Sequence, residues 1–92
     1  MGDELDGLRK QIDACDERLL LALRDRKDVV ALVGKYKKTR GLSSLDEKRW
    51  LVVLESRLAR AKELGLSEDF VLKVYNLIHQ YSLGVENIIK EL

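Results

Sequence analysis

The segment LDGLRKQIDACDERLLLALRDRKDVVALVGKYKKTR, residues 5–40, decides the fold of this chain. It extends over about ten helical turns without a proline, and its apolar residues recur at helical spacing. We therefore predict one long amphipathic helix that ends near Gly41, because glycine readily takes the left-handed conformation that stops a helix. The predicted apolar stripe consists of Leu5, Leu8, Ile12, Cys15, Leu19, Leu23, Val30 and Val33, with Cys15 as a small core residue.

Two positive charges, Arg26 and Lys37, lie in the middle of this apolar stripe. At about 100° per residue, Lys37 returns to within about 20° of Arg26, three turns further along the same face. An unpaired charge that faces a core is costly, so each cation needs an anionic partner. Pairing of Arg26 with a core carboxylate, such as Asp46 or Glu86, is the commoner arrangement in proteins. The separation of about 16 Å nevertheless favours a small dianionic ligand held between helices.

The predicted long helix exceeds the dimensions of a compact monomer. Residues 5–40 span roughly 54 Å, whereas a compact domain of 92 residues has a diameter of about 30 Å. We predict that a second copy covers the excess length in a symmetric homodimer, in which the long helices pair. Arg9 lies at the edge of the stripe, about 100° from Arg26. This direction suits a pocket of the dimer mate, so we expect sites that are shared between chains.

Two shorter helices account for the rest of the chain. Ser44 and Glu47 form an S-x-x-E capping box, which predicts the start of a second helix that runs to about Leu64 and stops at Gly65. Ser67 is the predicted cap of a third helix that reaches the C-terminus.

The opening turns of the second helix hold Asp46, Arg49 and Trp50. Free backbone N–H groups and the helix dipole favour anions at this end of a helix. From the residue types alone, Asp46 is interpreted as a first-turn acid and Trp50 as a core anchor.

The third predicted helix carries an apolar stripe and a polar flank. After Tyr75, the flank holds His79, Ser82 and Glu86 at helical spacing, and such a flank can face a site. For His79 taken by itself, a half-exposed hydrogen-bonding role is favoured. The apolar stripe, predicted to be core, consists of Phe70, Val74, Leu77, Ile78, Tyr81, Val85, Ile88 and Leu92.

The composition is that of one small domain. The chain has 92 residues, 46% of them hydrophobic, and no repeat or low-complexity segment marks a boundary, so we predict a single all-α domain, residues 1–92. A net charge of +1 lacks the basic excess of nucleic-acid binders. We find no membrane span, no secretory signal and only one cysteine. We therefore expect a cytoplasmic protein that binds neither nucleic acid nor membrane.

Several motifs occur together in one register along the chain. They are L-R-K-Q-I-D-x-x-D-E-R-L-L from Leu8, R-D-R-K at Arg24 to Lys27, G-K-Y-K at Gly34 to Lys37, D-E-K-R at Asp46 to Arg49, and Ser82 four residues before Glu86. Together they cover nearly the whole chain and resemble the all-helical AroQ-type chorismate mutases. The resemblance implies an intertwined homodimer with two equivalent sites and without metal or cofactor. Each site would combine Arg9 of one chain with Arg26, Lys37, Asp46, Arg49, Ser82 and Glu86 of the other.

The reaction implied by the resemblance is the [3,3] rearrangement of chorismate to prephenate. It involves one substrate molecule, so catalysis reduces to holding the reactive conformer and stabilising the charge that develops on the breaking ether. By the resemblance, Arg9 and Arg26 hold the two substrate carboxylates. Lys37 and the Glu86 carboxyl donate hydrogen bonds to the ether oxygen. Arg26, Lys37 and Glu86 are thus the predicted catalytic residues.

The resemblance also implies supporting roles, and the chain departs from the common bacterial pattern at two positions. Ser82 and Arg49 would support a carboxylate, and Asp46 the ring hydroxyl, mainly through its backbone. Glu86 stands where many relatives carry glutamine, and it donates only when protonated. Trp50, which we include among the substrate-binding residues, stands where relatives usually place a glutamate that accepts from the C4 hydroxyl.

The tryptophan leaves three alternatives open. The related isochorismate pyruvate lyases also lack an acid at this position, and 4-amino-4-deoxychorismate mutases act on a substrate with a different C4 group. A third alternative is a non-catalytic dimerisation or regulatory module, in which Trp50 fills a collapsed pocket.

Overall fold

The computed structural model describes residues 3–92, and within them the chain forms three helices and no strand. Helix α1 spans Glu4–Arg40, α2 spans Glu47–Glu63 and α3 spans Glu68–Glu91. The predicted all-α fold, with one long helix followed by two shorter ones, is confirmed.

Local capping explains most of the helix ends. The Asp3 side chain accepts a hydrogen bond from the Asp6 N–H at 2.8 Å and so caps α1. Gly41, with φ at 65°, ends α1 in the left-handed conformation, as predicted. The Ser67 hydroxyl accepts from the Phe70 N–H at 3.2 Å, which confirms the predicted cap of α3.

The predicted capping box at Ser44 is wrong. Helix α2 is capped by Asp46, whose carboxylate accepts from the Arg49 N–H at 3.0 Å. Ser44 is buried, and its hydroxyl lies 2.7 Å from Asn87 Oδ1 on α3, to which it donates. Because α3 satisfies the serine, the aspartate two residues later is the side chain that remains for the helix terminus.

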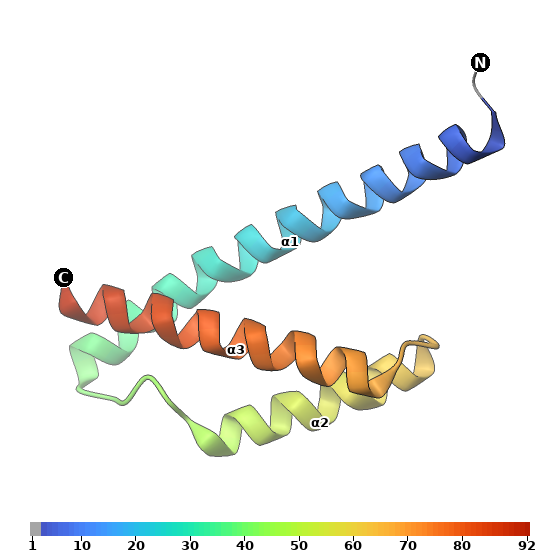
Figure 1. Cartoon of the computed structure of the whole chain (residues 1–92). Coiled ribbons are helices and arrows are strands. Elements are labelled where there is room, and N and C mark those ends of the chain that lie inside the picture. The colour runs from blue at the N-terminus through green and yellow to red at the C-terminus, as the bar shows by residue number, and fades with distance from the viewer. Residues whose placement is uncertain (1–2) are drawn as a thin grey trace.

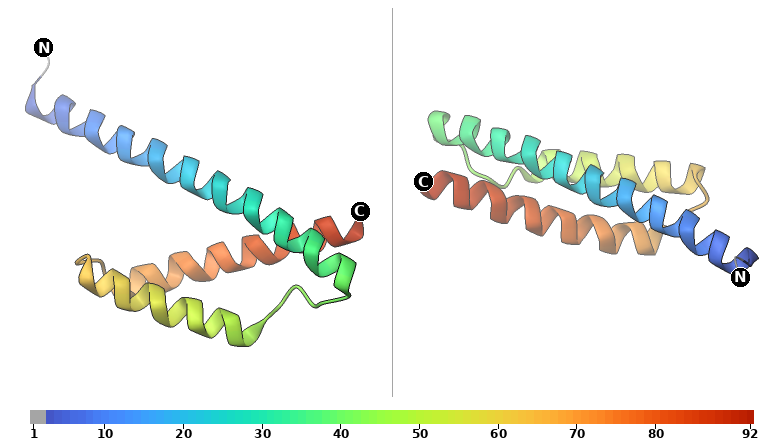
Figure 2. Two further views of the ribbon diagram at one scale, coloured as in Figure 1. Left: turned by 180° about the vertical axis from the view of Figure 1, so that it is seen from behind. Right: turned by 90° about the horizontal axis from the view of Figure 1, so that it is seen from above.

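The three helices form an open arrangement (Figure 1). Helices α2 and α3 lie antiparallel to each other, and the C-terminal half of α1 crosses α3, as the two further views confirm (Figure 2). The N-terminal half of α1 projects away from both. The molecule measures 58 × 28 × 15 Å with a radius of gyration of 16.9 Å, against about 12 Å for a compact chain of this length. The expected overhang of the long helix is therefore confirmed.

The buried core of one chain is small. Its buried apolar residues are Val53, Ala61 and Val71. Every residue from Asp3 to Asp25 is exposed, and this includes Cys15, so its predicted place in a core is wrong for the single chain. The physical reason is that neither α2 nor α3 reaches the N-terminal half of α1.

The inward face of α3 also differs from the prediction. Phe70, Leu77 and Tyr81, from the predicted core stripe, are 61%, 66% and 62% exposed. The polar flank is the buried side instead, with Ser82 and Glu86 only 8% and 6% exposed. Helices α1 and α2 both pack against this flank, and the apolar stripe of α3 is covered only in part.

Candidate functional site

A glycine brings α1 and α3 into close contact at the centre of the site. Gly34 is buried, and a Cβ atom at this position would lie 3.2 Å from the Glu86 Cα and 3.4 Å from the Ile89 Cβ. The absence of a side chain therefore lets the two backbones approach closely. Lys37, one helical turn further along α1, is thereby placed beside Glu86.

Lys37 and Glu86 form a largely buried ion pair. The Lys37 Nζ lies 2.8 Å from Glu86 Oε1, and the two side chains are 17% and 8% exposed. Nζ also donates to the Ser44 carbonyl oxygen at 2.6 Å. Glu86 Oε1 is buried, and within residues 3–92 the Lys37 ammonium ion is its partner.

Arg26, the other cation of the predicted stripe, also faces α3. Its guanidinium donates to the Ser82 hydroxyl, which in turn donates to the Ile78 carbonyl oxygen at 2.8 Å. The predicted alternative, in which Arg26 pairs with Asp46 or Glu86, does not occur. It is Lys37 that pairs with the carboxylate of Glu86, while Arg26 has a hydroxyl as its partner.

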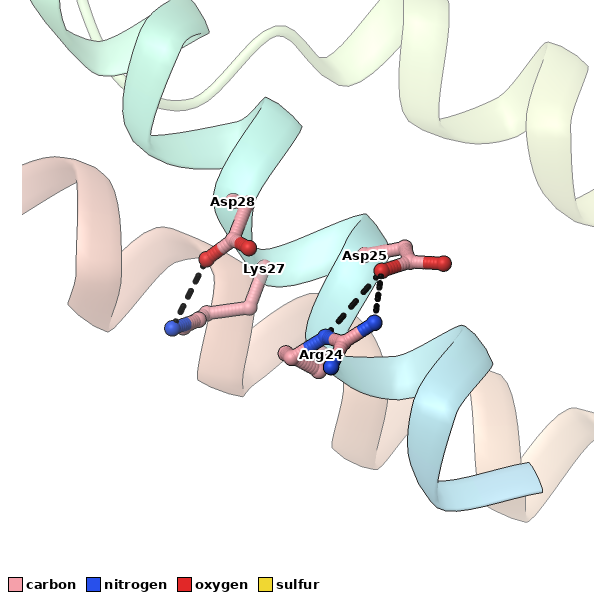
Figure 3. A network of polar contacts seen from close by, with 4 residues as sticks. All are labelled: Arg24, Asp25, Lys27 and Asp28. Atoms are coloured by element: carbon pink, nitrogen blue, oxygen red, sulfur yellow. Dashed lines mark hydrogen bonds and ion pairs between the residues drawn. The ribbon is translucent and has the colours of Figure 1, made fainter. Parts of the chain in front are cut away.

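The acids next to Arg26 in the sequence are engaged elsewhere (Figure 3). Arg24 and Asp25 are paired at 2.9 Å, and Lys27 and Asp28 at 2.8 Å, with all four side chains accessible to solvent. These exposed pairs contribute little to stability. They do leave Arg26 without a carboxylate partner, so its positive charge is available to a ligand.

An aromatic pair forms another wall of the site. The rings of Trp50 on α2 and His79 on α3 are stacked, with centroids 3.9 Å apart and an angle of 7° between their planes. Burial lowers the pKa of His79 below its ordinary value, and the positive charges of Arg26 and Lys37 lower it further, while Glu86 opposes them. The imidazole is therefore neutral at neutral pH.

These groups surround one cavity of about 200 Å³ between the three helices. Its lining carries four cationic side chains against two acidic ones, so the cavity is two positive charges in excess. Its volume is small for a ligand pocket, which suits a small polar ligand. The lining comprises Arg26, Val30, Val33, Lys37, Ser44, Asp46, Arg49, Trp50, Val53, Arg57, His79, Ser82, Leu83 and Glu86.

All predicted site residues except one line this cavity. The exception is Arg9, which lies on the exposed N-terminal half of α1. The sequence analysis did not identify Arg57 or Ser44 as site residues, and it assigned His79 only a half-exposed hydrogen-bonding role. Arg57 lies seven residues after Trp50 and His79 three residues before Ser82, and these helical spacings place each on the face of a predicted site residue. Ser44 had no such signal, because it was interpreted as a cap.

The amino-acid sequence is similar to those of known proteins. A family model described as chorismate mutase type II matches residues 8–87, nearly the whole chain. The chain belongs to the chorismate mutase type II family. It is therefore an enzyme of the chorismate mutase class, an isomerase, and the predicted family resemblance is confirmed.

Curated relatives in this family have two different names. A 4-amino-4-deoxychorismate mutase of Streptomyces venezuelae is 30% identical over 87 residues, which is 95% of this chain and 84% of that protein. A protein of the same name from Streptomyces pristinaespiralis is 32% identical, over 83% of this chain and 59% of that protein. The T-protein of Enterobacter agglomerans is 37% identical over 91% of this chain, but the match spans only 22% of the T-protein.

Two further features are absent from residues 3–92. None of the helices combines the length and apolar character that crossing a bilayer requires. Groups of three or more His, Cys, Asp or Glu side chains placed to hold a metal ion are also absent from this part of the chain.

Proposed function

We propose that this chain converts chorismate to prephenate. The observation that carries the proposal is the cavity between the three helices. Arg26, Lys37 and Glu86 line it, and its lining as a whole carries two positive charges in excess. Chorismate carries two carboxylates, so its charge matches that excess. Trp50 lies flat against His79 on the wall of this cavity, which argues against the alternative of a pocket collapsed around the tryptophan.

The residues at the cavity suit a rearrangement within one molecule. Arg26, supported by Ser82, binds one carboxylate and holds the substrate in the compact conformer that reacts. Lys37 lies next to Glu86 and donates to the ether oxygen as negative charge develops there. Glu86 lines the same cavity, and its carboxyl group provides the second donor to the ether oxygen. Arg49 supports a carboxylate, and Asp46 holds the ring hydroxyl, mainly through its backbone.

We further propose that two copies of the chain assemble into a homodimer with shared sites. A second cavity, of about 500 Å³, lies between α1 and α3 beside the charged one. Its lining is Leu23, Leu77, Ile78 and Tyr81 together with Arg24, Arg26, Lys27 and Ser82. It continues the exposed apolar stripe of α1, so we assign it to helix packing and not to chemistry. A second α1 covering it would bring Arg9 of the partner to the charged cavity, as the second carboxylate requires. The exposed thiol of Cys15 is compatible with the reducing cytoplasm, which remains our proposed compartment.

A second candidate function is supported by the names of two relatives. The proteins from Streptomyces venezuelae and Streptomyces pristinaespiralis are named 4-amino-4-deoxychorismate mutases. A 4-amino substrate has the same two carboxylates and the same breaking ether, and it differs only in the group on C4. The same cavity therefore performs the same rearrangement on it, provided that the C4 group is accepted.

A direct experiment separates these activities. The protein is incubated separately with chorismate, isochorismate and 4-amino-4-deoxychorismate, and the products are identified. We expect prephenate from chorismate with the highest kcat/KM. Salicylate with pyruvate as the main products, or aminoprephenate formed faster than prephenate, would assign a sibling activity. Binding of all three compounds without turnover would reject an enzymatic role altogether.

A further inference from the structure

Among residues 3–92, the stacked pair of Trp50 and His79 is the only aromatic part of the lining of the charged cavity. The ring centroids lie 3.9 Å apart with an angle of 7° between the planes, so the imidazole cannot tilt out of its plane without losing the stack. The tryptophan therefore fixes the plane in which the two imidazole nitrogens lie. A fixed, flat, polar group in a cavity wall is suited to recognising one substituent of a flat ligand.

His79 is also the uncommitted neutral polar side chain of this cavity. Ser82 accepts from Arg26 and donates to the Ile78 carbonyl oxygen, and Ser44 donates to Asn87. The imidazole has no hydrogen bond to any other group in residues 3–92. The indole of Trp50 offers one N–H donor and no acceptor, and the remaining polar side chains of the lining are charged. His79 is thus the uncommitted neutral side chain that can both donate to and accept from a neutral substituent on a bound ligand.

We propose that the His79 imidazole, held flat by Trp50, binds the substituent on C4 of the substrate ring together with the backbone of Asp46, and that it selects a hydroxyl over an amine. This inference rests on the proposed function, because it assumes that the two carboxylates and the ether occupy the cationic side of the cavity. The ring and its one neutral substituent then remain for the aromatic wall.

The selectivity follows from charge. An aliphatic amine is protonated at neutral pH, and its ammonium ion can only donate hydrogen bonds. In the cavity it meets an excess of cations and, at the wall closed by Trp50, a neutral imidazole. The two carboxylates of the lining are already engaged, Asp46 by the Arg49 N–H and Glu86 by Lys37. A hydroxyl, by contrast, both donates to one imidazole nitrogen and carries no charge. The relatives named for the 4-amino compound therefore do not decide the substrate of this chain.

Kinetics on the two substrates test the proposal. For His79→Ala we expect kcat/KM on chorismate to fall about tenfold, the loss of one buried hydrogen bond, and kcat/KM on 4-amino-4-deoxychorismate to change less than twofold. His79→Gln keeps a donor and an acceptor and should recover part of the loss on chorismate. Tyr75→Phe, one helical turn before His79 and outside the cavity lining, is the matched control and should leave both values unchanged.

A second variant tests the wall itself. Trp50→Glu places a carboxylate where the aromatic ring stands, and a carboxylate pairs with an ammonium ion. We expect the ratio of kcat/KM values to shift at least tenfold toward the 4-amino substrate. Trp50→Phe keeps a flat face for the imidazole and should keep the preference for chorismate. If Trp50→Glu lost activity on both substrates equally, or His79→Ala reduced both equally, the pair would be structural and the proposal wrong.

The chain contains one histidine, so its imidazole signals are assigned without ambiguity in an NMR spectrum. Prephenate retains the C4 hydroxyl and is not consumed further, and at neutral pH it should move the His79 nitrogen resonances of the wild-type protein. Prephenate that binds without moving these resonances would overturn the inference while leaving the proposed rearrangement intact. A wild-type protein that turns over neither substrate would instead reject the proposed function, and the two failures are thus distinguished.

Discussion

The two halves of α1 have the same amphipathic pattern but different surroundings. Every residue from Asp3 to Asp25 is exposed, and the large apolar side chains of this half, such as Leu8 and Ile12, are 55% and 59% exposed. The C-terminal half crosses α3 (Figure 1). It buries Gly34 and directs Arg26 and Lys37 toward α3. The C-terminal half of α1 thus has packing partners within its own chain, and the N-terminal half does not.

This difference shows how one continuous helix can serve two sites. An apolar stripe as long as that of the N-terminal half is unfavourable in water, and it exceeds what monomeric proteins usually expose. Arg9 lies on this half, and it does not line the cavity to which Arg26 belongs. In the proposed homodimer, each α1 would complete its own site with its C-terminal half and the partner's site with its N-terminal half.

The largest expected effect is the loss of activity when the site arginine of either half of α1 is removed. Arg9→Ala and Arg26→Ala should each lower kcat/KM about 100-fold or more, because each removes a charge-assisted contact to a carboxylate. An equal mixture, after subunit exchange, should recover about a quarter of the wild-type activity, since half of the dimers then contain one intact site. Lys10→Ala, on the same exposed half, is the control. Exchanged heterodimers without activity, or a folded monomer in sedimentation, would show that Arg9 does not serve a partner.

The next effect concerns the acid that faces the C-terminal half. Glu86 is proposed to donate a hydrogen bond to the ether oxygen. Glu86→Gln keeps an N–H donor at the same position and should remain active, whereas Glu86→Ala removes the donor and should lose about 100-fold in kcat. Steady-state kinetics on chorismate measure both. Equal losses in the two variants would remove Glu86 as a donor from the proposed mechanism.

Substitution of one glycine in each half of α1 should change the free energy of unfolding in opposite directions. Gly34→Ala places a methyl group 3.2 Å from the Glu86 backbone, and we expect it to lower the free energy of unfolding by about 1–3 kcal/mol. Gly7 has no atom of the chain near its would-be Cβ, so Gly7→Ala should raise the free energy of unfolding by up to about 1 kcal/mol through helix propensity. Urea denaturation at one protein concentration measures both. Equal effects of the two substitutions would contradict the assigned difference between the halves.

The smallest expected effect is a pH dependence of stability from His79. Burial, Arg26 and Lys37 lower the pKa of this imidazole below its ordinary value of 6.5 in the folded chain. As pH falls below that value, the unfolded chain therefore binds more protons, and the free energy of unfolding decreases. His79→Gln removes this contribution, so its urea midpoint should fall less than that of the wild type over the same acidification. An identical fall in both proteins would place the pH dependence at other groups.

Local signals in the sequence predicted most helix ends and the shared face of Arg26 and Lys37. Periodicity placed the two cations three turns apart on one face, and the structure confirms that both point toward α3. The choice of Asp46 over Ser44 as the cap of α2 was not predictable, because it depends on the contact of Ser44 with Asn87 on α3. The stack of Trp50 on His79 joins two helices and was invisible in the sequence for the same reason.

The sequence by itself determined that this protein consists of one long and two shorter helices, and that its motifs are those of a chorismate mutase. Periodicity, capping residues and motif spacing act over a few neighbouring residues, so they can be read without a fold. Only the tertiary structure decided that the polar flank of α3, with Ser82 and Glu86, is the buried side. The side of a helix that becomes buried depends on which neighbours reach it, and in this chain the close approach at Gly34 places α1 on that flank.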